Sequence, residues 1–81
     1  MKQIPRAFGS TLLRLREAAR MSQQALAAKA GLDRTFISLL ERGRRQPTIT
    51  TLVILCDALG VSLQQMIDQF EEELPKKPLK L

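Results

Sequence analysis

The segment from residue 34 to residue 42 carries side chains that could bind the edges of DNA bases. On a helical wheel at 100° per residue, one face collects guanidinium, hydroxyl and methyl-bearing groups: Arg34, Thr35, Ser38, Leu39 and Arg42. Arginine pairs bidentately with guanine, Ser and Thr reach base edges, and methyl groups contact thymine. Ile37 and Leu40 point the opposite way. The pattern predicts a base-reading helix; its alternative is a solvated polar face.

Residues suited to catalysis or metal binding are scarce. The chain has no His and no Tyr, and its one cysteine, Cys56, lies in the apolar run 52–59. Zinc sites need three or four ligands, and a buried thiol is a better interpretation of Cys56 than a redox switch. The acids at 71–73 are interpreted as a solvated patch rather than a general acid–base pair. We therefore predict no enzyme activity, no metal, no cofactor and no small-molecule ligand.

Basic residues are unevenly distributed along the 81 residues, whose net charge is +5. Residues 1–50 hold ten Lys and Arg against three acids, whereas residues 51–81 hold three Lys against five acids. A surface dominated by positive charge attracts a polyanion. The N-terminal part is therefore predicted to face nucleic acid, although charge alone leaves a solvated basic surface as the alternative.

Helical periodicity and capping residues divide the chain into five short helices. They are expected at about residues 6–20, 23–30, 34–42, 48–59 and 63–74. Ser22, Asp33 and Ser62 are predicted N-caps, and one of residues 48–51 caps the fourth helix. No segment alternates in the manner of a strand. The predicted fold class is all-α, a compact bundle of five short helices containing a helix-turn-helix.

The chain is expected to form one domain over residues 1–74, followed by a flexible basic tail at 75–81. Pro75 and Pro78 interrupt any continuation of the last helix. No apolar run reaches the roughly 18 residues that a membrane span requires, and a single cysteine suits a reducing compartment. We predict a cytoplasmic protein with no membrane contact.

Residues 23–43 have the arrangement that a helix-turn-helix needs. Two short helices are joined by a tight turn containing Gly31, and small residues (Ala27, Ala28 and Ala30) occur where the helices must approach closely. In this motif the first helix braces the second, which is presented to the DNA major groove.

These residues resemble a known family. Ser22-Gln23 through Ala27, with Gly31, Ile37, Glu41-Arg42-Gly43 and Pro47, is similar to the phage-repressor/Cro-like (XRE-type) helix-turn-helix family, over about residues 12–67. The run 32–38 followed by Glu41-Arg42-Gly43 resembles a subgroup that includes the controller proteins of restriction–modification systems and many stand-alone regulators.

The resemblance implies a transcriptional regulator that binds double-stranded DNA, with a role for each matching position. Bases would be read by Arg34, Thr35 and Ser38, with Leu39 as a further contact. The DNA backbone would be held by Gln23, Arg42, Arg44 and Arg45. Arg16 and Glu41 match a partly buried structural salt bridge. Two departures are Phe36, where the subgroup often has Tyr, and Leu39, where other members have amides.

The last helix carries an apolar stripe longer than a small core needs, which predicts a homodimer interface at Met66, Ile67, Phe70 and Leu74. The alternative is that half of the stripe is plain core, with Leu63 and Ile67 pointing inward. Similar family members dimerise through this region. Two reading helices about one DNA turn apart would recognise a near-palindrome. The alternative function is a helical protein-interaction module, such as an antitoxin-like partner.

Overall fold

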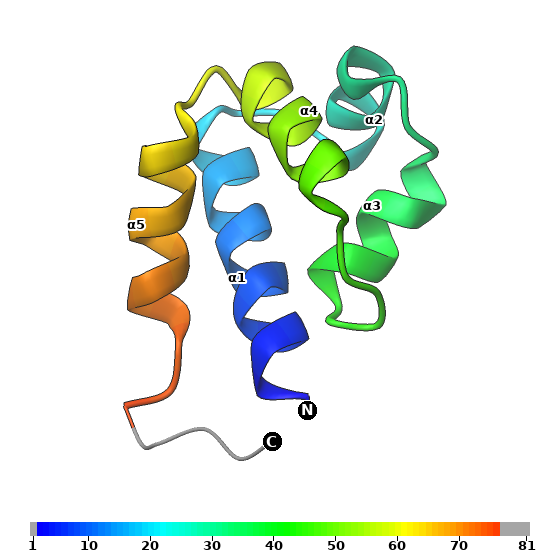
Figure 1. Cartoon of the computed structure of the whole chain (residues 1–81). Coiled ribbons are helices and arrows are strands. Elements are labelled where there is room, and N and C mark those ends of the chain that lie inside the picture. The colour runs from blue at the N-terminus through cyan, green and yellow to red at the C-terminus, as the bar shows by residue number, and fades with distance from the viewer. Residues whose placement is uncertain (1, 77–81) are drawn as a thin grey trace.

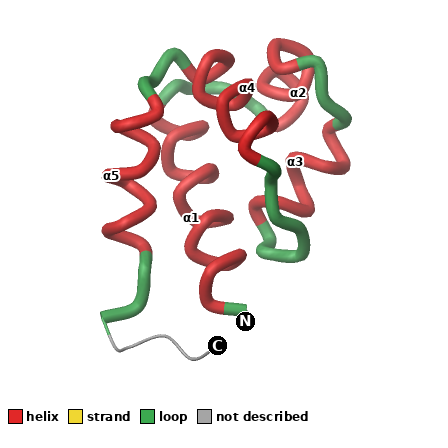
Figure 2. The backbone as a smooth tube through the Cα atoms, in the orientation of Figure 1, coloured by secondary structure: helices red, strands yellow, loops and turns green. Residues whose placement is uncertain are grey.

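The computed structural model describes residues 2–76, which fold into five α-helices with no strand among them (Figure 1). The helices are α1 (Gln3–Ala18), α2 (Gln23–Ala30), α3 (Arg34–Glu41), α4 (Ile49–Leu59) and α5 (Leu63–Glu73). The predicted all-α bundle of five short helices is confirmed. Short loops join the helices, and the longest connects α3 to α4 (Figure 2). Of the predicted basic tail, only Pro75 and Lys76 lie within the described residues; the rest of that prediction falls outside them.

Local side-chain caps explain where four of the helices begin. Backbone N–H groups in the first turns donate to the predicted caps Ser22, Asp33 and Ser62, at 3.0, 2.8 and 3.0 Å. Thr48 caps α4 by accepting from the N–H of Thr51 at 3.1 Å. Each such cap satisfies a donor that the helix itself leaves unpaired.

Helix α1 begins at Gln3 rather than near Arg6, and it ends at Ala18 rather than Arg20. Pro5 is tolerated because it lies in the first turn, where backbone N–H groups have no intrahelical partner. At the other end Arg20 takes a left-handed φ of 57°. The chain therefore leaves the helix two residues earlier than periodicity predicted.

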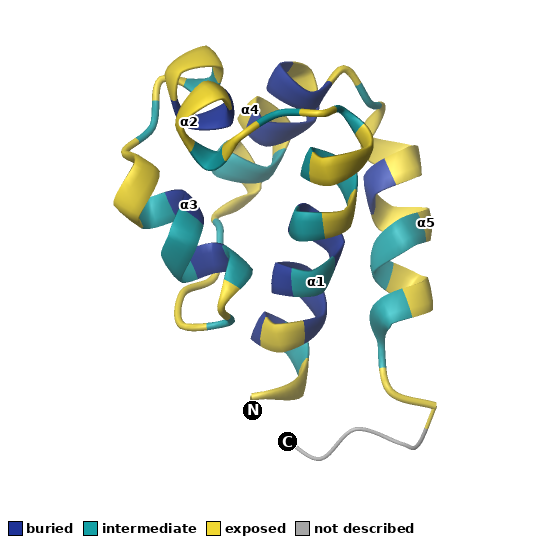
Figure 3. Cartoon of the chain, turned by 180° about the vertical axis from the view of Figure 1, so that it is seen from behind, coloured by how far each residue is buried: buried dark blue, intermediate teal, exposed yellow. Residues whose placement is uncertain are grey.

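Aliphatic side chains from all five helices meet in one core. The largest fully buried ones are Leu12, Leu26, Ile37, Leu40, Leu55 and Met66. Helix α1 packs against both α3 and α5, and α4 covers α2 and α5. Seen from behind, the buried residues of each helix face the middle of the bundle (Figure 3). Helix α3 is thus packed against both α1 and α2.

Helix α5 faces the core differently from the prediction. Met66 is fully buried, while Leu63 and Ile67 are 46% and 38% exposed. The prediction that Met66 contacts a second copy is therefore wrong, and so is the alternative in which Leu63 and Ile67 belong to the core. Ile67 at a homodimer interface stays a prediction. The apolar stripe is wider than the contact with α1, and periodicity does not say which of its edges faces inward. Phe70 follows Met66 on the inner edge and packs edge-on against Phe8 of α1, with ring centroids 6.4 Å apart.

Within the described residues, no single helix is long and apolar enough to cross a membrane. Helices α4 and α5 meet the length and hydropathy requirement only as a pair, and the pair is bent by 105°.

Candidate nucleic-acid interface

Helix α3 presents the predicted reading face to the surface. Ile37 and Leu40 are fully buried and attach the helix to the core. Arg34 and Thr35 are exposed at its N-terminal end, and Ser38 and Leu39 are half-buried further along. The carboxylate of Asp33 is engaged as the N-cap, and the side chain of Glu41 is only 4% exposed. Neither acid offers a free charge that would repel phosphate from this face.

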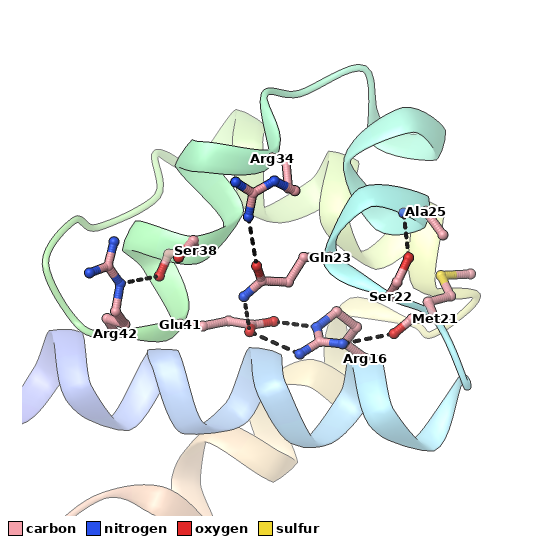
Figure 4. A network of polar contacts seen from close by, with 9 residues as sticks. All are labelled: Arg16, Met21, Ser22, Gln23, Ala25, Arg34, Ser38, Glu41 and Arg42. Carbon is pink, nitrogen blue, oxygen red and sulfur yellow. Dashed lines mark hydrogen bonds and ion pairs between the residues drawn. The ribbon is translucent and has the colours of Figure 1, made fainter.

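A partly buried ion pair holds the C-terminal end of α3 against α1. Arg16 donates from Nε to Glu41 Oε2 at 2.6 Å and from Nη2 to Oε1 at 3.1 Å (Figure 4). A third donor of Arg16, Nη1, binds the carbonyl of Met21 at 2.8 Å. The hydrogen bonds to Glu41 raise the pKa of the Arg16 guanidinium, against an opposing effect of desolvation. The salt bridge suggested by the family resemblance is present.

Gln23, the first residue of α2, joins this network at both ends of its amide. Its Nε2 donates to Glu41 Oε1 at 2.9 Å, and its Oε1 accepts from Arg34 Nη1 at 3.4 Å (Figure 4). Gln23 therefore links the first residue of α3 to the last. The family resemblance predicts a phosphate contact for Gln23 but not this hydrogen bond to Glu41, because the bond depends on how α2 crosses α3.

The turn after α3 gathers basic side chains. Arg42, Arg44 and Arg45 are exposed, and Arg42 donates to the carbonyl of Ser38 at 3.4 Å. Two further cations, Lys2 and Arg6 at the start of α1, lie beside this turn and line one hollow with it. Both residues belong to the basic N-terminal part of the sequence, but no local pattern predicts that they lie next to residues 42–44.

An exposed apolar surface lies away from the reading face, on α4 and α5. We define the apolar surface as Ile49, Val53, Leu63 and Ile67, of which Ile49 is 75% exposed. It borders a hollow of about 290 Å³ whose walls include Ile49, Ile67 and Phe70. Of the predicted interface residues, Phe70 and Leu74 are half-buried. Ile49 and Val53 were not among the predicted interface residues, although their spacing of four residues places them on one side of α4.

Comparison with known proteins agrees with this geometry. A family model described as "Helix-turn-helix" matches residues 12–66, a stretch that contains α2, α3 and the Arg16–Glu41 pair. The chain belongs to this helix-turn-helix family. It is a DNA-binding transcriptional regulator of the XRE type, in a family of regulators rather than enzymes.

Named relatives of this helix-turn-helix regulator include controller proteins. It is 35% identical over 74 residues to the control protein C.MunI of a Mycoplasma species, covering 90% of this chain and 100% of that protein. It is 41% identical over 64 residues to an uncharacterised HTH-type transcriptional regulator, y4dJ, of Sinorhizobium fredii, covering 79% and 83% of the two chains. Among solved structures, the chain is similar to the restriction–modification controller protein C.Esp1396I, which was solved as a tetramer in complex with its natural 35 base-pair operator. The two superpose with a TM-score of 0.84 at 30% sequence identity, and the match covers 90% of this chain and 96% of that chain.

Proposed function

We propose that this regulator binds a near-palindromic operator in double-stranded DNA as a homodimer, with α3 of each copy in the major groove. The observation that carries the proposal is the exposed face of α3, which has donors and methyl groups but no free carboxylate. In the proposed complex, bases are read by Arg34, Thr35, Ser38 and Leu39. The DNA backbone is bound by Gln23, Arg42, Arg44 and Arg45.

The rigid support of α3 favours base reading over loose electrostatic binding. Bidentate hydrogen bonds to base edges require side chains held in a defined register. Glu41 is bonded by Arg16 from α1 and by Gln23 from α2, so both neighbouring helices restrain α3. Gln23 begins α2, and a helix N-terminus is also a favourable place for a backbone phosphate.

Dimerisation is the second part of the proposal. The apolar surface offers four exposed aliphatic side chains on two adjoining helices, and burying such side chains is the usual driving force of association. A twofold dimer would set two α3 helices about 34–36 Å apart, which is one turn of DNA. The tetramer of C.Esp1396I on its operator is a precedent for assembly in a relative.

We further propose that the regulator acts in the cytoplasm and that its own concentration sets operator occupancy through dimerisation. Cys56 is a free, buried thiol, which suits a reducing compartment. A molecular mass that stays monomeric at all concentrations in sedimentation would contradict control by dimerisation.

The deciding experiment is selection of bound duplexes from a random library near physiological salt, with the variant Arg34→Ala/Thr35→Ala as control. We expect enrichment of a near-palindrome with half-sites about 10–11 base pairs apart, which the control fails to enrich. Equal enrichment by both proteins, or none, would mean that the basic face binds only backbone or no DNA. The chain would then be better described as a helical protein-interaction module.

A further inference from the structure

Four cations from two distant segments surround one hollow at the C-terminal end of α3. The hollow measures about 430 Å³ and is lined by Lys2, Arg6, Arg42, Gly43 and Arg44. No acidic side chain is in its wall. The ion pairs found in the described part of the chain join Arg14 to Glu73 and Arg16 to Glu41, so none of the four cations is neutralised by either pair.

The close packing of Gly43 on α1 brings these cations together. Gly43 has a φ of +72°, which turns the chain back after α3. A Cβ built on Gly43 would lie 3.0 Å from Cγ of Arg6 and 3.1 Å from its Cα. Only a residue without a side chain lets the turn approach α1 so closely. The juxtaposition of Arg6 with Arg42 and Arg44 is therefore built into the backbone.

Like charges gathered in this way repel one another, and binding an anion relieves the repulsion. A neighbouring hollow of about 280 Å³ shares Gly43 and Arg44 and adds Arg45 to its wall. Two adjoining hollows lined by cations therefore meet at Gly43 and Arg44. An extended polyanion fits such a surface better than a single small anion does.

The position of the hollow relative to α3 indicates which polyanion it would bind. Helix α3 has eight residues, about 12 Å of helix, and the DNA major groove is about 12 Å wide. When the N-terminal residues of a reading helix contact base edges, its C-terminal end lies toward one phosphate strand. The hollow is at that end, opposite Gln23 and Arg34.

We propose that this hollow binds a phosphate of the DNA backbone flanking the bases read by α3, with Lys2 and Arg6 of α1 as previously unassigned contacts. The inference rests on the proposed function. It adds contacts from the start of α1 to those already proposed for Arg42 and Arg44 at the C-terminal end of α3.

The test is a scan of the selected operator with neutral methylphosphonate groups, one phosphate at a time, against wild type and Arg6→Ala. Wild type is expected to lose roughly fivefold in affinity at one flanking phosphate per half-site, the upper range for an exposed ion pair. Arg6→Ala should already be weaker by a similar factor. It should lose less than wild type at that phosphate, because three cations of the hollow remain, and a double-mutant cycle reports the difference as coupling. The slope of log K against log salt should fall by about 0.9 per copy.

Arg14→Ala is the matched control, because it removes the same charge from the same helix. The side chain of Arg14 is 66% exposed and pairs with Glu73 on α5, outside the hollow. It should show no coupling to any single phosphate. Lys2→Ala, at an exposed position before α1, repeats the test if Arg6→Ala melts at a lower temperature.

The outcomes separate this inference from the function on which it rests. Operator selection that depends on Arg34, with no phosphate coupled to Arg6 or Lys2, would overturn only the present inference. Saturable binding of inorganic phosphate by the free protein, without coupling to the operator, would also overturn it. Loss of operator selection in wild type would instead overturn the proposed function.

Discussion

At the scale of single residues, the side chain of Glu41 joins the C-terminal end of α3 to both α1 and α2. Its carboxylate accepts two hydrogen bonds from Arg16 and one from Gln23, and Gln23 in turn accepts from Arg34. The side chains of Arg16 and Glu41 are 13% and 4% exposed. A buried pair of this kind is costly to break, because the remaining partner keeps an unmatched charge.

We expect Glu41→Gln to lower the free energy of unfolding by about 2–3 kcal/mol, less than a full deletion because the amide still offers one acceptor. For a chain of this size the corresponding fall in Tm is roughly 10–20 °C. Thermal unfolding followed by circular dichroism measures it. Arg14→Ala removes an arginine whose side chain is 66% exposed, although that of its partner Glu73 is 16% exposed, and should cost under about 1 kcal/mol. Equal losses in the two variants would contradict the argument that burial of both partners makes the Arg16–Glu41 pair costly to break.

The second prediction at this scale concerns Cys56, whose pKa is raised by burial. The pKa of the Cys56 thiol is therefore higher in the folded state than in the unfolded state. At pH values below the unfolded-state pKa, the neutral buried thiol contributes its full share to the free energy of unfolding. This stability is lost as the pH rises through the folded pKa. We expect urea denaturation to show a steeper alkaline loss of stability for wild type than for Cys56→Ala. Arg16 does not add to this pH dependence: its pKa is raised as well, so the guanidinium stays charged over the pH range in which the thiol titrates. Parallel pH profiles of the two proteins would contradict the expectation.

At the scale of elements, the position of α3 depends on a close approach between two backbones. A Cβ on Gly9 of α1 would lie 2.5 Å from the carbonyl oxygen of Glu41 and 2.7 Å from that of Leu40. Both contacts are to backbone atoms, which cannot move aside as a flexible side chain can. Gly9 therefore determines how closely the C-terminal end of α3 lies on α1, and with it the orientation of the reading face.

We expect Gly9→Ala to push α3 away from α1, at a cost of roughly 1–3 kcal/mol for an overpacked contact. Operator affinity should fall further than the loss of folded protein explains, because the reading face changes its register. Isothermal titration at a temperature where the variant is fully folded measures this. Gly60→Ala is the control: it has a strained φ of +72° but no atom within 4 Å of the added Cβ. A variant Gly9→Ala with wild-type affinity would show that α3 is positioned by other contacts.

Whether a feature depends on contacts within one helix or between helices decides whether it could be predicted from the sequence. The caps Ser22, Asp33 and Ser62 bond backbone groups two or three residues away, so a local pattern reveals them. Ile37 and Leu40 were assigned to the core because their helix has one clearly apolar side. Features that depend on packing between helices could not be predicted in this way. Examples are the burial of Met66 rather than Ile67 and the position of Arg6 beside Gly43. Arg16 and Glu41 are 25 residues apart, and only the family resemblance linked them.

At the scale of the whole molecule, cationic and apolar groups occupy different elements. The exposed cations Arg34, Arg42 and Arg44 lie on α3 and the turn after it, whereas the apolar surface lies on α4 and α5. A protein divided in this way can contact DNA with one side and a second copy with the other. In the proposed complex each half-site is contacted by a separate copy, and dimerisation converts the second contact into an intramolecular one.

Replacement of Ile49 by Lys tests the proposed dimer, since Ile49 is 75% exposed and lines the apolar hollow. Its side chain contributes little to the core, so we expect a folded variant whose sedimentation mass is that of a monomer. Affinity for the full palindrome should fall at least tenfold, through loss of effective concentration, while affinity for an isolated half-site stays unchanged. Ile54→Lys is the matched control on the same helix: Ile54 is 36% exposed but does not line the hollow, and it lies about 140° around the helix from Ile49. If both variants remain dimers, the apolar surface is not the interface. If wild type is a monomer and binds the palindrome no more tightly than Ile49→Lys does, assembly plays no part in recognition.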